Sequence, residues 1–364
     1  MSNMLTKFDN WLTGNAGPAA LVIREHLMPV EGHDGVLFPP TFAAGDTFPG
    51  GYNVDIFDDG KNVCLIDSVG SQANRIEPLF MDGDYARLVP QVVIEAGEVK
   101  VNLLEAGHRG GDAIVRCTSL QKELQAAFRS VLKGDAWALA KIAPTSLVFG
   151  VWDSRDTQAK LPRLIASTVR AFDVRRLTRG AVYTPPLDYS GLEVFSEEDK
   201  TKAEGDKKSP LSKRGFVHNP ASGSPGGVIA TGGIRRDATL SLNALRLLRA
   251  GDDAEKAVIL RRYILGLALV AFTHSPWGYL RQGCNLVLDP DKPREFVEVY
   301  GDGRRLPATV TAAEALPYAT AAAGAFGVGE NRTLAFDREL AKKDVQGDPA
   351  KEKKGKAGRK AKNA

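Results

Sequence analysis

The sequence predicts an α+β protein in which single strands alternate with helices and long insertions. Short apolar or alternating stretches at 19–28, 63–66 and 164–172 are typical of strands. Apolar residues recur at helical spacing in 120–132 and dominate 254–272, which indicates two helices, the second of them central. Because the order mixes single strands with helices and contains large insertions, it favours α+β over a doubly wound parallel sheet.

Composition limits the class of protein before any motif is considered. The chain has 364 residues, of which 43% are hydrophobic and 25% charged, an ordinary globular balance. Its three cysteines, Cys64, Cys117 and Cys284, are far apart, which argues against a disulfide framework or a zinc knuckle. No run approaches the roughly 18 to 20 apolar residues of a membrane span, and the start lacks a signal-peptide pattern. We therefore expect a cytoplasmic protein with no membrane partner.

Charge is unevenly distributed along the chain. The formal net charge is +4, yet residues 342–362 alone hold nine Lys or Arg against three acidic residues. We expect residues 337–364 to form a basic disordered tail, either a solvated end or an arm that contacts nucleic acid. The rest of the chain is slightly acidic, so nucleic-acid binding there requires local basic patches.

Local patterns predict the remaining elements. Residues 19–28 place Arg24 and His26 among apolar neighbours in a partly alternating strand, and 36–52, rich in Pro, Gly and Phe, is typical of a long loop. The other expected elements are a hairpin of 91–95 and 98–104, strands at 147–151, 285–288 and 295–300, and helices at 72–80, 241–249 and 311–326.

The pattern breaks down between residues 178 and 233. This stretch combines a Pro-rich segment, a mixed-charge run and a Gly-rich segment. So long an irregular stretch within a domain is usually functional or mobile. We expect one elaborated domain over 19–326, from which 178–233 projects as an insertion with a mobile tip at 196–212.

The usual signatures of catalysis are missing from the sequence. There is no phosphate-binding P-loop, no dinucleotide-binding GxGxxG and no GxSxG elbow. The five histidines are never spaced i, i+4 and have no cysteine nearby. His33 and Asp34 match the first half of a metal-dependent HD pair, but no second half is evident. We therefore expect no metal, no cofactor and no catalytic residue, and hence a protein that is not an enzyme.

One motif, residues 67–77, carries a strand into a helix through small residues. Gln72, Asn74 and Arg75 then lie where free backbone N–H groups at the helix start suit phosphate oxygens. An ordinary helix capped by Ser71 accounts for the same run equally well.

Arg75 has a second interpretation of its own. It can pair with Asp67 or Glu77 and hold the turn instead of contacting a phosphate. The sequence leaves both interpretations open.

Three more motifs place polar donors and cations at the ends of strands. The run 107–112 holds His108 and Arg109 in a Gly-rich turn, and 226–240 holds the adjacent Arg235 and Arg236, which cannot easily share one face. The run 151–162 carries Ser154, Arg155, Gln158 and Lys160, beside Trp152, which is either a core residue or a stacking platform. Together these motifs suit a protein that follows a single-stranded RNA backbone.

Five blocks of this sequence resemble a known family. DSVGSQANRIE, LLEAGHRGGDAIVR, FGVWDSRDTQAKLPRLI, RGFVHNP and GGVIATGGIRRDATL are similar, in this order, to the RAMP-superfamily backbone subunit of type I-G (formerly I-U) CRISPR effector complexes. The likeness runs from about residue 21 to 289 and continues more weakly to 326.

The resemblance implies a fold and a function. The fold would be a modified RRM-like (ferredoxin-like) palm with inserted helical fingers and an extended hairpin thumb. The function would be non-catalytic binding of crRNA, along which copies stack head-to-tail in a filament for RNA-guided recognition of DNA in antiviral defence. The implied partners are the crRNA, the target DNA strand paired to it, further copies of the chain, the large subunit and the repeat-handle-binding subunit of Cascade, and a recruited helicase-nuclease.

The resemblance also implies which residues bind RNA. These are Arg24, Ser71, Gln72, Asn74, Arg75, His108, Arg109, Arg155, Gln158, Lys160, Arg235 and Arg236. Two rival functions remain. A type III-like backbone subunit would cut RNA with an aspartate such as Asp188 or Asp237, and a stand-alone RNA-processing endoribonuclease would need a general base that the sequence does not display.

Overall fold

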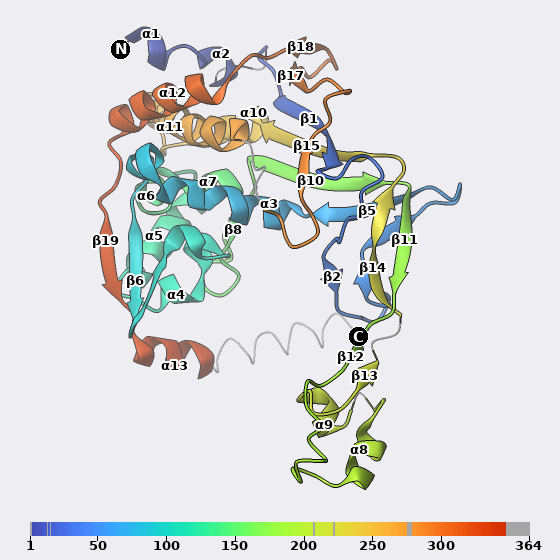
Figure 1. The fold of residues 1–364 in the computed structure, drawn as a ribbon. Coiled ribbons are helices and arrows are strands. Elements are labelled where there is room, and N and C mark those ends of the chain that lie inside the picture. The colour runs from blue at the N-terminus through green and yellow to red at the C-terminus, as the bar shows by residue number, and fades with distance from the viewer. Residues whose placement is uncertain are drawn as a thin grey trace, which may run out of the picture.

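The computed structural model describes residues 2–12, 14, 16–206, 208–220, 223–274 and 279–346. It confirms the α+β class, with a helical lobe beside a largely antiparallel sheet and an arm that projects from the sheet (Figure 1). Within these residues no helix combines the length and apolar character that a membrane crossing requires.

An antiparallel sheet of eight strands forms the centre of the fold. Seven strands lie in the order β18 (Arg305–Pro307), β17 (Glu295–Val299), β1 (Ala20–Pro29), β15 (Ile234–Ser241), β10 (Ile165–Phe172), β5 (Asn62–Asp67) and β4 (Val54–Ile56). The eighth, β16 (Leu286–Leu288), pairs with the end of β1. The strands expected from the sequence at 19–28, 63–66, 164–172, 285–288 and 295–300 are confirmed.

The two faces of this sheet differ in polarity because alternate side chains of a strand point in opposite directions. In β1, Leu21 and Ile23 are fully buried in the main core, whereas Arg24 and His26 are half-buried on the opposite face. We call this second face the open face.

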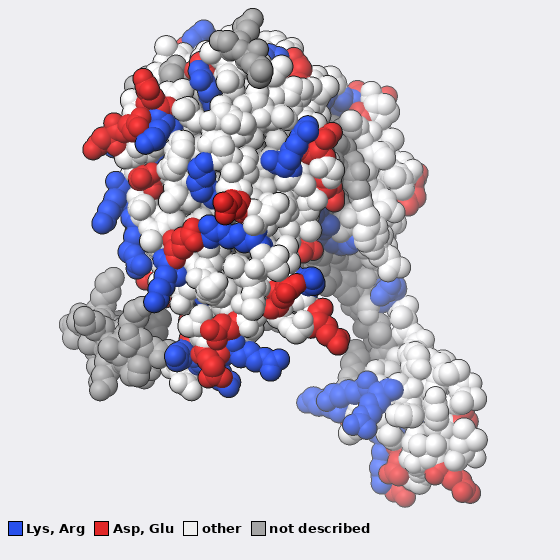
Figure 2. Space-filling view, turned by 90° about the vertical axis from the view of Figure 1, so that its left-hand side faces the viewer, with Lys and Arg blue, Asp and Glu red and all other residues white. Residues whose placement is uncertain are grey.

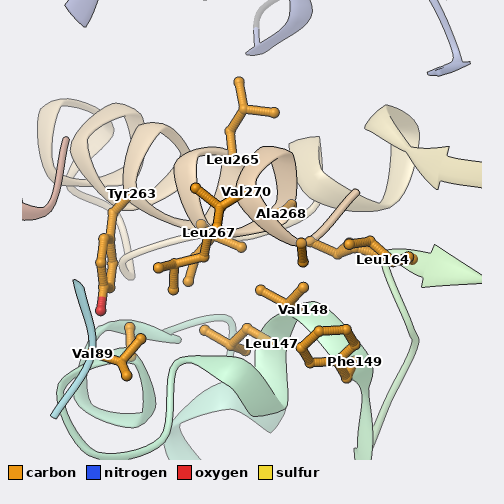
Figure 3. Packing of buried hydrophobic residues seen from close by; sticks show 14 of the residues in the cluster. Val89, Leu147, Val148, Phe149, Leu164, Tyr263, Leu265, Leu267, Ala268 and Val270 are labelled. Carbon is orange, nitrogen blue, oxygen red and sulfur yellow. The ribbon is translucent and has the colours of Figure 1, made fainter. Parts of the chain in front are cut away.

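The main core lies between the helices and the first face of the sheet. Its principal helices are α7 (Thr145–Phe149), α10 (Leu242–Arg246), α11 (Ala254–Thr273) and α12 (Ala312–Phe326). Figure 3 shows side chains of α11 such as Leu267 directed towards Leu147 and Val148 of α7. Helix α12 packs closely on α11: a Cβ added at Gly266 would lie 2.8 Å from the Cα of Ala319, so glycine permits this approach.

The prediction of a strand at 147–151 is wrong. Residues 145–149 form helix α7, and only the two-residue strand β8 (Val151–Trp152) follows it. A continuous apolar run cannot distinguish a buried strand from a buried helix by periodicity. Every residue of α7 is buried, and Gly150 ends the helix with a positive φ of 78°.

A helical lobe is inserted between β5 and β10. It contains the expected hairpin, with Gly97 at φ 67° in the turn, and the expected amphipathic helix, although Leu132 at the end of that helix is exposed. Its elements are α3 (Val69–Ile76), β6 (Val92–Ala96), β7 (Val99–Asn102), α4 (Ala113–Arg116), α5 (Gln121–Leu132), α6 (Trp137–Ile142) and α7, together with β19 (Arg332–Ala335), which pairs in parallel with β6.

The projecting arm continues two central strands of the sheet. After β10 and before β15 the chain forms a ribbon of β11 (Val174–Arg179) and β14 (Ser224–Ala230), then the short pair β12 (Val182–Tyr183) and β13 (Asn219–Pro220). Figure 1 shows this arm extending away from the body. At its root, the hydroxyl of Tyr52 accepts a hydrogen bond from the Gly227 N–H (2.9 Å), so the aromatic loop 36–52 packs on the ribbon.

The tip of the arm differs from the irregular segment expected at 196–212. It holds two short helices, α8 (Glu197–Ala203) and α9 (Pro210–Lys213). Ser212 of α9 joins the two helices by donating a hydrogen bond to the carbonyl of Ala203 in α8 (2.8 Å). Beside the helices, Phe216 packs edge-on against Tyr189 (4.9 Å) and Phe195 (6.4 Å), and these contacts stabilise structure that the charged sequence does not suggest.

The basic tail also begins later than expected. Residues 338–346 form helix α13 (Arg338–Gln346), and Asp344 of this helix accepts a hydrogen bond from Arg116 of α4 (2.7 Å). Disorder from residue 337 onward is therefore wrong for 338–346. The rest of the expected tail lies outside the described residues.

A chain of buried polar side chains crosses four neighbouring strands on the core side of the sheet. Arg236 donates to Glu25 (2.6 Å) and to Ser167 (3.0 Å). Ser167 donates to Gln72 (2.9 Å), which in turn donates to Asp67 (2.7 Å). Three further arginines close the ends: Arg294 on Glu25, and Arg75 and Arg281 on Asp67. We call this set the buried polar chain; it ties β1, β15, β10 and β5 to the start of α3.

The adjacent arginines of β15 provide a direct test of the buried polar chain. Arg236→Ala should lower the free energy of unfolding by about 3 kcal/mol, because it leaves the buried Glu25 with only Arg294. Arg235→Ala, the matched control on the open face, should cost under about 1 kcal/mol. Urea unfolding of both variants measures the difference, and equal losses would contradict the assignment of faces.

Candidate nucleic-acid interface

Helix α3 begins earlier than the sequence suggested. Its N-cap is Ser68, whose hydroxyl accepts a hydrogen bond from the Ser71 N–H (3.2 Å). The expected cap at Ser71 is therefore wrong; Ser71 itself is half-buried in the first turn. The helix follows β5 directly, and Asp67 at the end of that strand is fully buried.

Gln72 does not reach the surface. Only 1% of the residue is exposed, and its amide is occupied on both sides by Ser167 and Asp67. A direct contact between Gln72 and RNA is therefore wrong for this conformation, because the side chain holds the buried polar chain together.

Arg75 is likewise engaged within the protein. It donates to Asp67 (3.2 Å) and to the carbonyl oxygens of Leu280 (2.7 Å) and Tyr279 (3.5 Å). Of the two interpretations that the sequence allows, the structure thus favours the one in which Arg75 pairs with Asp67 and holds the turn. Glu77 is not its partner.

Glu77 pairs instead with Arg109, which joins three segments of the lobe. The Arg109 Nε lies 2.6 Å from the Glu77 carboxylate, and the guanidinium donates to the side chain of Asn74 and to the carbonyl of Gly150, both at 3.3 Å. Burial raises the pKa of the Glu77 carboxyl to about 7, although the Arg109 charge opposes this shift. Arg109 itself is only 4% exposed, so it positions the surrounding segments.

A basic pocket opens where these segments meet. It has a volume of about 390 Å³. We define it by six of its lining residues: His108, Arg109, Trp152, Ser154, Lys160 and Arg163. It thus brings together His108, Arg109 and Lys160, which the sequence predicted from two separate motifs.

Two cations of the basic pocket have no acidic partner among the described residues, in contrast to Arg109, which pairs with Glu77. Among the described residues, neither Lys160 nor Arg163 has a carboxylate within ion-pair distance. Burial, and secondarily the like charge of Arg109, lowers the pKa of the Arg163 guanidinium. A ligand with negative charge would relieve this repulsion.

An aromatic ring lies beside these cations. Trp152 is 58% exposed, and the Lys160 Nζ lies 5.7 Å from the centre of its ring. The choice that the sequence left open is therefore settled: Trp152 is not a core residue. An exposed indole next to a cation can stack on a base while the cation contacts a phosphate.

Arg155 and Gln158 lie on the exposed turn that leads to Lys160. The buried Asp153 holds this turn by accepting hydrogen bonds from the N–H groups of Asp156 and Thr157. Both predicted side chains are exposed at the edge of the basic pocket.

The open face of the sheet carries a second group of predicted residues. Asp237 accepts hydrogen bonds from Arg24 (3.3 Å) and Arg235 (2.9 Å), and Arg235 also lies over the Phe172 ring at 4.8 Å. Arg24 and Arg235 are therefore partly neutralised. Arg236 lies on the opposite, buried face, so its expected contact with RNA is wrong.

The sequence analysis missed the cations at the root of the projecting arm. Arg175, Arg176 and Arg179 of β11 are exposed and have no ion-pair partner within the part of the chain that is described. Figure 2 shows further basic side chains gathered on one side of the distal part of the arm, whereas both signs mix over the visible face of the lobe. Three arginines within six residues, with no acid among them, were the signal available in the sequence.

Comparison with known protein families finds a match in the first half of the chain. Residues 21–176 are similar to the family of CRISPR-associated protein GSU0053. The similarity supports a CRISPR-associated protein. The matched residues cover less than half of the chain, from β1 to the middle of β11, and include the whole basic pocket. No curated protein matches the chain.

Arg75→Ala separates a structural role from an RNA contact. The variant should lose about 1–3 kcal/mol of stability, because Asp67 and two carbonyl groups lose a donor. The dependence of guide-RNA affinity on salt should stay unchanged. Arg155→Ala is the matched control, since Arg155 is exposed and should leave thermal stability unaltered. A reduced salt slope with normal stability in Arg75→Ala would reverse our interpretation.

Proposed function

We propose that the chain is a non-catalytic crRNA-binding backbone subunit of a type I-G CRISPR effector complex. The observation that carries this proposal is the basic pocket, where Lys160 and Arg163 lack acidic partners in the described chain and lie near the exposed Trp152. Uncompensated cations attract a polyanion, and an exposed ring accepts a base of any sequence. The pocket lies within the residues similar to a CRISPR-associated protein.

The strand order supports an RRM-like palm. Numbered by their place in the chain, β1, β10, β15 and β17 lie in the order 4-1-3-2, with every neighbour antiparallel. Helices lie between the first and second of these strands and between the third and fourth. This is the βαββαβ arrangement of ferredoxin-like folds. The inserted helical lobe corresponds to the proposed fingers and the projecting arm to the proposed thumb.

The distribution of charge supports a path for the RNA along the proposed fingers and thumb, beside the palm. Arg175, Arg176 and Arg179 mark the root of the thumb, and Lys160 and Arg163 mark the inserted lobe. In this proposal the protein contacts the backbone of the crRNA and leaves sequence reading to base pairing with the target DNA. Copies of the chain would stack head-to-tail, beside the large and repeat-handle-binding subunits.

The surroundings of two aspartates favour binding over cleavage. Asp237 is paired with Arg24 and Arg235. Hydrogen bonds from Ser190 and Lys200 lower the pKa of Asp188 to about 2, which makes it a poor general base at neutral pH. Neither aspartate therefore offers a free general base, which supports binding over cleavage by general-base catalysis.

Assembly on RNA tests the proposed function. Recombinant protein should co-purify with RNA and elute far above its mass of 39.1 kDa, because each copy covers a short stretch of the guide. Labelled guide and target RNA should stay intact with and without Mg²⁺. An RNA-free monomer that ignores added guide, or a Mg²⁺-dependent cut, would contradict the proposal.

Lys160→Ala locates the binding site in the same experiment. Removing one phosphate contact should lower the slope of log K against log salt by roughly 0.7, about equally for every guide sequence. Lys133→Ala, at an exposed lysine that ends α5, is the matched control and should leave the slope unchanged. The same slope in both variants would remove the basic pocket from the RNA path.

A further inference from the structure

A cluster of one imidazole and two carboxylates lies where the loop after β1 meets the turn after β16. The His33 Nε2 is 3.8 Å from an oxygen of Asp289 and 3.9 Å from an oxygen of Asp291. All three potential ligand atoms lie within 4.8 Å of one another. The function proposed above makes no use of these residues.

Asp289 is the unusual member of this cluster. Its side chain is 1% exposed, and among the described residues the Oδ2 atom has no hydrogen-bond partner. The Oδ1 atom accepts a hydrogen bond from the Asp291 N–H (3.1 Å) and faces His33, whereas Oδ2 faces the Lys292 Nζ at 3.5 Å. A buried carboxylate that is satisfied only by one long ion pair and one hydrogen bond is costly, which indicates that this position favours a bound cation.

The spacing of the three groups suits a metal better than direct hydrogen bonds. Separations of 3.8 and 3.9 Å exceed hydrogen-bond length, but they are short enough for an ion about 2.0 to 2.2 Å from each atom to lie between His33 and either carboxylate. His33 and Asp291 are largely exposed, so small rotations can complete the coordination and leave positions open to water. One imidazole with two carboxylates is a ligand set for Zn²⁺ or a similar ion, whereas Mg²⁺ prefers oxygen alone.

We propose that His33, Asp289 and Asp291 bind one divalent transition-metal ion of the Zn²⁺ class, which fastens the loop after β1 to the turn after β16. Lys292 is 46% exposed on its side chain and swings into solvent when the ion binds. Asp34, the neighbour of His33, takes no part. The carboxylates that join His33 in this site, Asp289 and Asp291, thus come from a distant part of the sequence.

Zinc binding by the untagged full-length protein tests this proposal. Calorimetric titration at pH 8 should show one Zn²⁺ per chain. His33→Ala and Asp291→Asn each remove an exposed ligand and should weaken binding at least about tenfold. Asp34→Asn, the matched control, removes a neighbouring exposed charge and should bind as the wild type does.

Two results would overturn the proposal. One is the absence of a saturable Zn²⁺ site in the wild type. The other is a set of variants that does not distinguish the proposed ligands. Equal binding by all variants would indicate that the ion binds elsewhere, and an equal loss in Asp34→Asn and Asp291→Asn would indicate non-specific attraction. Thermal unfolding without metal should be nearly the same for the exposed-site variants, which shows that any lost binding is not lost folding. Because no RNA is present, the outcome is independent of the RNA-binding proposal.

Discussion

The architecture depends on the buried polar chain from Glu25 and Arg236 through Ser167 and Gln72 to Asp67. Charges away from water are stable only when each one is paired and hydrogen-bonded, so these side chains allow few alternative positions. They come from β1, β15, β10, β5 and α3, elements far apart in sequence. Because each of these side chains needs its partner, their hydrogen bonds fix the register of the sheet and the residue at which α3 begins. The surfaces described above lie on the elements that these hydrogen bonds hold in place.

Arg109 is a second buried, paired charge, and it lies directly below the surface of the lobe. Its buried guanidinium joins Asn74, Glu77 and Gly150, and these contacts hold the walls of the basic pocket in place. The cations that face solvent, Lys160 above all, can then remain without acidic partners in the described chain because the framework does not rely on them. Buried, paired arginines thus stabilise the fold, whereas exposed cations without acidic partners in the described chain are available for binding.

The root of the projecting arm is where the proposed activities of the chain meet. The ribbon of β11 and β14 follows β10 and precedes β15, from which Asp173 and residues 231–233 separate it. Lys292, which pairs with Asp289, lies near Gly233, where the chain returns from the ribbon to the sheet. The proposed cation site therefore adjoins the base from which the arm projects.

The sequence by itself determined the α+β class, most strands and the long helices, because hydrophobic periodicity is a local property that each segment carries alone. It also singled out His108, Arg109 and Lys160 in two separate motifs, and the structure brings these residues to one pocket. Only the tertiary structure decided which of two adjacent arginines is buried, since the face of Arg236 depends on Glu25, more than two hundred residues away. The apolar run at 145–149 is also decided by tertiary structure, because it is buried on all sides among other helices and forms helix α7. His33 is a third case, since the pairing of β1 with β16 brings Asp289 and Asp291 to it.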